Sequence, residues 1–209
     1  MSAAEKLSHK VEAYNLSHDS ENKIHDDTIA QQLGFTGGLV PGVEVFAYAT
    51  TPAVMMWGPA FLESGRMQCR FAKPVYDGRI AEGVARPTGE VTLDITVESD
   101  GVLSATGQAQ MPAARPTAPN PGDYAASLPP AERPPANETS LAVGTNLGIA
   151  PEKLTGEVAD QYLADVRETA AIYKELHVAH PGWLLRLCNL ALKDNGGETA
   201  WVRVGSAGG

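Results

Sequence analysis

The 209-residue sequence has few cysteines, few aromatic residues and fewer basic than acidic side chains. Its two cysteines, Cys69 and Cys188, lie in patterned apolar segments and predict buried thiols of a reducing cytosol, not a disulfide scaffold. The formal net charge of -9 argues against nucleic acid and anionic membrane surfaces as partners. No apolar run reaches the roughly 18 residues that a membrane span needs. We therefore expect a cytoplasmic protein that binds neither nucleic acid nor membrane.

More than half of the prolines are concentrated in one stretch. Eight of the 15 lie between Pro112 and Pro135, among Ala, Asn and Gly residues that show no periodicity. Such a composition cannot bury a core, so it predicts an extended linker. The chain then divides into a first domain (residues 1–111), a linker (112–137) and a second module (138–209).

The pattern of the first domain predicts an α+β fold. Residues 43–57 are apolar on nearly every face and predict a buried helix, with Pro41 at its start and Pro52 expected to kink or shorten it. Alternating residues and the turn signal Asp100–Gly101 predict antiparallel strands after the helix. These strands are expected near residues 66–71, 80–85, 91–97 and 102–111, with an earlier strand at 10–15. A sheet wrapped around one central helix would bury that helix.

The alternation also assigns side chains to the inner face of this sheet. The residues expected to point inward are Met67, Cys69, Phe71, Val91, Leu93, Ile95 and Val97.

The second module repeats the beginning of the first. The segments LVPGVEVFAYA (residues 39–49) and AHPGWLLRLCN (179–189) share a Pro-Gly pair followed by an apolar helix pattern, and each precedes a predicted strand. The second strand would lie at Ala200–Val204, after which the chain offers no further strands. We expect a duplicated but incomplete module.

The candidate catalytic residues lie in the stretch SENKIHDDTIAQQLGFTGGLVPG (residues 20–42). Backbone amides at a helix N-terminus suit a developing oxyanion, and a histidine oriented by an acid is a common general base. His25 lies among carboxylates and is therefore a candidate base. The alternative is a surface histidine beside a helix over residues 28–33 that Asp26 or Asp27 caps.

This stretch resembles the hydratase motif of the MaoC-like dehydratases, a hotdog-fold family that includes (R)-specific enoyl-CoA hydratases. The matching residues are Asn22, Ile24, His25, Ala30, Gly34 and Phe35. The resemblance implies a hotdog fold for the first domain and the start of a second hotdog in residues 138–209. Two positions depart from the pattern: Ser20 stands at the family's catalytic Asp, and Lys23 at its Pro.

The resemblance also implies roles for individual residues. His25 would be the base, with Ser20 and Asn22 beside it, and Gly42 would donate its amide to a thioester carbonyl, next to Gly38 and Val40 in the substrate-binding loop. No cofactor is implied except coenzyme A as part of the substrate. Arg66 and Arg70 could contact its phosphates, or they could lie on a solvated sheet face. No histidine has metal-ligand spacing, so no metal is expected.

Three functions remain open at this point. The first is a hydro-lyase that adds or removes water at the 2,3 position of an acyl-CoA-type substrate. The second is a hotdog thioesterase, for which Glu44 is the candidate carboxylate. The third is a non-catalytic acyl-CoA-binding or partner subunit, which Ser20 and the short second module favour. The missing strands would leave an apolar surface, so a homodimer or higher homo-oligomer is expected.

Overall fold

The computed structural model describes residues 6–17, 27–32, 34–124 and 126–197. The chain forms two compact units: Met1–Pro116 with Thr155–Trp183, and Thr117–Leu154 with Leu184–Gly209. Their bounds differ from those of the predicted modules, because residues 155–183 pack with the first unit. The partial second hotdog stays a prediction, since Ala200–Val204 lies outside the described residues. None of the described helices is long and apolar enough to cross a membrane.

The first unit contains one antiparallel sheet of five strands in the order β1-β3-β4-β5-β2. These strands are β1 (Leu7–Glu12), β2 (Arg66–Phe71), β3 (Ile80–Pro87), β4 (Thr92–Ser99) and β5 (Val102–Gln110). The strand expected at residues 10–15 thus begins and ends three residues earlier. Asp100 and Gly101 both have positive φ (51° and 76°), which confirms the predicted tight turn between β4 and β5.

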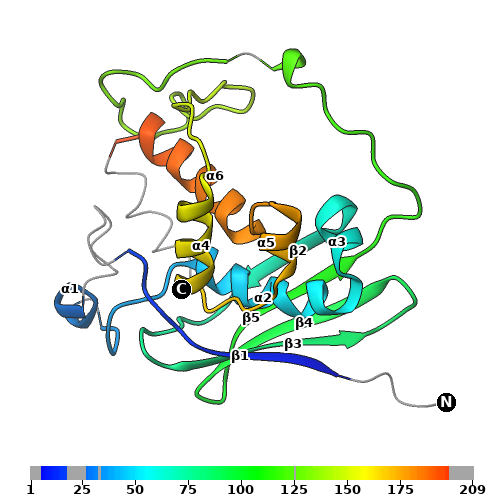
Figure 1. Cartoon of the computed structure of the whole chain (residues 1–209). Helices are drawn as coiled ribbons and strands as arrows, with labels where there is room; N and C mark the ends of the chain where they lie inside the picture. Colours follow the sequence, from blue (N-terminus) through cyan, green and yellow to red (C-terminus); the bar gives the residue numbers. More distant parts are fainter. Residues whose placement is uncertain (1–5, 18–26, 33, 125, 198–209) are drawn as a thin grey trace. The chain divides into compact units, whose positions relative to one another are not determined.

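Helix α2 (Gly42–Trp57) lies across one face of the sheet (Figure 1). Its buried residues pack on Leu93, Ile95 and Val97 of β4 and on the inward alanines of β3 and β5. The α+β hotdog architecture expected from the sequence is confirmed by this sheet and its central helix. Pro52 was expected to kink or shorten this helix. It does not shorten the helix, because α2 continues beyond it to Trp57, and the kink stays a prediction.

Several predicted burials are also wrong. Phe71 and Val91 are about half exposed, and Cys188 is exposed. Phe71 is the last residue of β2, and Val91 directly precedes the first residue of β4, so both lie where a strand begins or ends. At the end of α2, Met55 and Met56 are exposed as well. Cys69 is half-buried, and its desolvation raises the pKa of the thiol to about 11.

Five further α-helices belong to the described fold. Two short ones lie between β1 and β2 in the sequence: α1 (Asp27–Gln32) and α3 (Pro59–Ser64). In the first unit, α4 (Gly156–Asp165) and α5 (Ile172–Leu176) follow the proline-rich region. Helix α6 (Pro181–Asn195) confirms the helix expected after the second Pro-Gly pair, and a 3-10 turn η2 (Pro121–Asp123) lies in the second unit.

Within the second unit, one buried side-chain amide joins the backbone at Gly148 to the end of α6. Asn195 donates to the Gly148 carbonyl at 2.6 Å and accepts from the Gly148 N–H at 2.9 Å. Its Nδ2 also donates to the carbonyl of Ala191 at 2.7 Å. The neighbouring Ile149 donates its N–H to the carbonyl of Ser127 in the predicted linker at 3.0 Å, so paired backbone groups join that linker to the start of the predicted second module.

Candidate functional site

The predicted catalytic residues His25, Ser20 and Asn22 lie outside the described residues. Their roles stay predictions. The structure does describe the predicted substrate-binding loop with Gly38 and Val40, and the start of α2 at Gly42.

The loop is held against the turn before β3 by a short antiparallel pairing. Val40 donates its N–H to the Val75 carbonyl at 2.8 Å, and Asp77 donates its N–H to the Gly38 carbonyl at 3.2 Å. The Asp77 carboxylate in turn accepts the N–H of the fully buried Asn15 at 2.7 Å. The chain just after β1, the turn and the glycine-containing loop therefore form one connected assembly leading into α2.

Two amides at the first turn of α2 remain available. The N–H groups of Glu44 and Val45 both donate to the Pro41 carbonyl, at 3.0 and 3.2 Å. Among the described residues, no hydrogen bond uses the N–H of Gly42 or Val43. The first amides of a helix point along its axis at the positive end of the dipole, so this end can stabilise negative charge on a ligand oxygen.

The Phe71 ring of β2 lies beside this helix start. A Cβ added to Gly42 would lie 3.3 Å from the ring carbon Cε2 of Phe71. The ring is 46% exposed, so it forms an accessible apolar surface next to the free amide. The pairing of an accessible apolar ring with an amide donor suits a ligand that carries a carbonyl on an apolar chain.

Glu44, the carboxylate considered for a thioesterase, lies in the first turn of α2 and is fully buried. Nearby on the same helix, burial raises the pKa of Tyr48 to about 12, and Glu44 adds to this shift. The Tyr48 hydroxyl accepts the N–H of Tyr14 at 3.2 Å. A general base must reach its substrate, so the burial of Glu44 counts against the thioesterase alternative.

Arg66 and Arg70 occupy exposed positions of β2. Arg70 lines a hollow of about 480 Å³ on the outer face of the sheet, together with Gln68, Asp94 and Thr106. Side chains at these positions point away from the face that α2 covers. A contact of the two arginines with coenzyme A phosphates stays a prediction.

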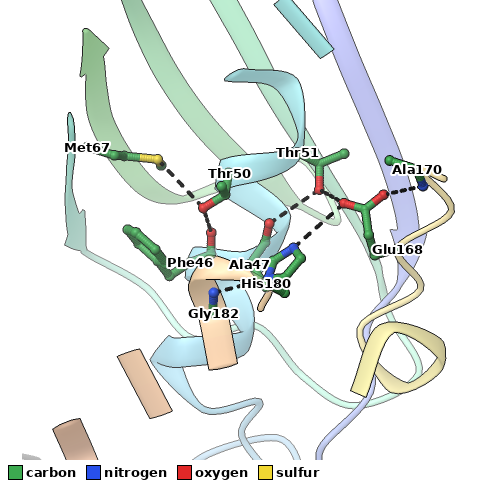
Figure 2. A network of polar contacts seen from close by, with 9 residues as sticks. All are labelled: Phe46, Ala47, Thr50, Thr51, Met67, Glu168, Ala170, His180 and Gly182. Atoms are coloured by element: carbon green, nitrogen blue, oxygen red, sulfur yellow. Dashed lines mark hydrogen bonds and ion pairs between the residues drawn. The ribbon is translucent and has the colours of Figure 1, made fainter. Parts of the chain in front are cut away.

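A second polar arrangement lies at the middle of α2, entirely within the first unit (Figure 2). The Thr51 hydroxyl donates to Glu168 Oε2 at 2.8 Å, and the Ala170 N–H donates to Glu168 Oε1 at 2.7 Å. His180 Nε2 lies 3.7 Å from Glu168 Oε2, too long for a hydrogen bond but close enough for an electrostatic contact. The side chains of His180 and Glu168 are 1% and 2% exposed.

The surroundings shift the pKa values of both partners downward. Burial opposes the charged form of Glu168, but the contact with His180 and the hydrogen bonds from Ala170 and Thr51 outweigh it and lower the pKa of the carboxyl. Burial also lowers the pKa of His180, against the opposing attraction of Glu168. The pair is therefore a buried carboxylate beside a neutral imidazole at neutral pH.

This arrangement was not predicted from the sequence. Thr51 lies in an otherwise apolar helix pattern, and Glu168 follows no motif, so neither gave a signal. The helix α4 could have been found, because Thr155 caps it by accepting the Val158 N–H and its apolar residues recur at helical spacing. Among the described residues, no group of three His, Cys, Asp or Glu side chains could hold a metal ion.

Solved structures that are similar to this chain include hydratases and a dehydratase. The (R)-hydratase from A. caviae involved in PHA biosynthesis is 16% identical and has a TM-score of 0.40, over 54% of this chain and 98% of that one. The R-hydratase PhaJ1 from Pseudomonas aeruginosa is 16% identical, with a TM-score of 0.43 over 63% and 92% of the two chains. A MaoC-like dehydratase from Phytophthora capsici is 14% identical, with a TM-score of 0.45 over 51% and 41%.

No protein-family model matches the sequence, and no curated protein does. The family expected from the motif is represented among the similar structures. Because the TM-scores lie below 0.5, the hotdog assignment rests on the sheet order and on α2 themselves.

Proposed function

We propose that this protein is an acyl-thioester hydratase or dehydratase of the MaoC-like type. The observation that carries the proposal is the unused N–H of Gly42 at the start of the central helix α2. Seventeen positions earlier in the chain, the motif supplies His25 as a base. The substrate class is an acyl chain on coenzyme A, with the carbon–carbon double bond next to the thioester.

In the hydration direction His25 accepts a proton from water, and the water oxygen forms a bond to C3 of the enoyl chain. Electrons of the double bond move toward the thioester carbonyl, whose oxygen accepts the Gly42 N–H. The proton is then delivered to C2, so that one water molecule is added in total. Phe71 would lie against the apolar part of the substrate. Ser20 can hydrogen-bond the water but cannot serve as the base, because a hydroxyl has a pKa far above 7.

The departure at Ser20 favours one alternative, a non-catalytic subunit that binds acyl-CoA. The same helix start and the same ring would then bind the thioester without turnover. We further propose a cytoplasmic location, supported by the two free cysteines. We also propose a homodimer, supported by the edge strands β1 and β2, each of which pairs with a single strand among the described residues.

To test this proposal, purified protein is mixed with crotonyl-CoA and with longer enoyl-CoAs. Hydration is measured as the loss of absorbance of the conjugated thioester. His25→Ala should lower kcat/KM by about 10²- to 10⁴-fold, the usual contribution of a positioned base. His177→Ala, which removes an exposed histidine, is the matched control and should retain activity. Ser20→Asp should raise activity if the missing carboxylate limits the rate.

The amide donor can be removed by one substitution. Gly42→Pro deletes the N–H at a position where proline suits a helix start, and Pro41 before it has an extended backbone (φ -57°, ψ 146°) that tolerates a following proline. We expect a loss of about 10²- to 10³-fold in kcat. Gly42→Ala keeps the N–H while adding a side chain against Phe71, and should lose less. Equal activities of these two variants, or of His25→Ala and the parent, would rule out the assigned roles.

A further inference from the structure

The segment from Thr155 to Gly182, here called the cover, packs on α2 within the first unit. Tyr162 and Val166 of the cover belong to the same hydrophobic core as the buried residues of α2. At its end, a Cβ added to Gly182 would lie 2.9 Å from Cβ of Ala47. The cover therefore contributes to the burial of the central helix.

One buried carboxylate anchors the cover to α2. Glu168 accepts the Thr51 hydroxyl at 2.8 Å across 117 residues of sequence, while the Ala170 N–H holds its other oxygen at 2.7 Å. A buried charge is stable only while such donors surround it. A second ionisable group buried beside this carboxylate therefore affects the anchor when it changes its charge.

His180 is the group that can bring such a charge. Its Nδ1 accepts the N–H of Gly182 at 3.0 Å, so the neutral ring carries its proton on Nε2, which lies 3.7 Å from Glu168 Oε2. A second proton would have to bind Nδ1, where it would face the Gly182 N–H. That N–H belongs to the first turn of α6, the positive end of the helix dipole.

The other groups that face His180 do not remove this conflict. The rings of Tyr173 and Tyr162 have centroids 4.7 and 5.7 Å from the imidazole, and His9 of β1 adds a repulsive interaction. Glu168 attracts the protonated form, but burial is the larger effect and the pKa of His180 is lowered. Since this pKa is lower in the folded than in the unfolded state, stability is present above about pH 6.5 and is lost as the pH falls.

We propose that the cover is an acid-sensitive element: protonation of His180 breaks its contact with Gly182 and releases residues 155–182 from α2 while the sheet stays folded. All five strands come from residues 7–110, so the cover can open without breaking a strand pairing. Acid thereby uncovers the face of α2 that carries Ala47 and Thr51.

Hydrogen–deuterium exchange of the full chain at pH 7.5 and 5.5 tests this proposal, after correction for the intrinsic pH dependence of exchange. Amides of residues 156–182 should exchange several-fold and up to about tenfold faster at pH 5.5, the most that one histidine with an ordinary pKa in the open state can give. Exchange in β3, β4 and β5 should be unchanged. An equal rise in the strands would overturn the proposal, since it indicates global unfolding. So would an unchanged cover. The exchange of the cover and that of the strands are both measured on the unsubstituted protein.

His180→Asn isolates the cause. Asn can accept the Gly182 N–H as a helix-capping side chain but does not titrate, so the acid-induced rise in the cover should disappear. The matched control His177→Gln removes an exposed histidine of the same segment and should keep the rise. A rise that persists in His180→Asn, or that vanishes in His177→Gln, refutes the assignment to His180.

Discussion

Two neighbouring threonines on α2 make different contacts although both are buried. The Thr50 hydroxyl donates to the Phe46 carbonyl of its own helix at 2.8 Å and lies 3.7 Å from the Met67 sulfur. The Thr51 hydroxyl reaches the Glu168 carboxylate. Hydrogen bonds to charged groups contribute more to stability than those between neutral groups. Thr50 therefore makes its hydrogen bond within its own helix, whereas Thr51, the next residue, joins two segments that are distant in the sequence.

We expect Thr51→Val to lower the free energy of unfolding by about 1.5–3 kcal/mol, because it leaves a buried carboxylate with one donor fewer. Thr50→Val is the matched control, since it makes the same change one residue earlier and removes no contact with a charge. It should cost less than about 1 kcal/mol, as a neutral hydrogen bond does. Urea denaturation followed by circular dichroism measures both. Similar losses for the two variants would contradict the importance given to Glu168.

At the scale of elements, the contact of α2 with β3 depends on Pro52, which has no backbone N–H, and on Gly83, which has no side chain. Pro52 has no N–H, so the Tyr48 carbonyl lacks its usual partner four residues on. That carbonyl faces Gly83, where an added Cβ would overlap its oxygen. The absence of a side chain at Gly83 allows β3 to approach the helix closely at this point.

Gly83→Ala should therefore destabilise the protein by about 1–3 kcal/mol, the range for overpacking a tight contact. Backbone atoms on both sides leave little room for adjustment. Gly156→Ala is the control, because a Cβ there meets nothing within 4 Å and the residue begins α4. That variant should be neutral or slightly more stable. Thermal or urea unfolding of the two variants decides, and a neutral Gly83→Ala would disprove the close approach.

The elements could be predicted from the sequence where their signals are local. The alternation of Leu93, Ile95 and Val97 fixed β4 to within a residue or two, and the Asp100–Gly101 turn fixed its partner. The burial of Phe71 was mispredicted because alternation assigns a side chain to one face of a sheet but does not reveal how completely that face is covered. The pairing of Thr51 with Glu168 could not be predicted either, since it joins residues 117 positions apart.

At the scale of the whole molecule, the sheet has two edges. Among the described residues, β1 and β2 each pair with a single strand, β3 and β5 respectively. An unpaired strand edge can add a strand from another chain. Closed two-fold dimers are the commonest way in which such self-association ends. These edges support the proposed homodimer.

Light scattering coupled to gel filtration should give a mass twice that of one chain at micromolar concentration. The peak should be monodisperse, because a two-fold interface closes and adds no third copy. A folded, monodisperse monomer at that concentration would exclude a stable dimer. Polydisperse aggregates would contradict it as well, since they indicate an edge that does not close.

The two thiols differ in a way that has a practical use. Maleimides react with the thiolate, and a pKa of about 11 leaves only about one Cys69 side chain in a thousand ionised at pH 8. Cys188 is exposed and belongs to the second unit, whereas Cys69 belongs to the first. Brief labelling of the unmodified sequence should therefore place a fluorophore on the second unit alone. The protein carries its own attachment point for spectroscopy, with no engineered cysteine required.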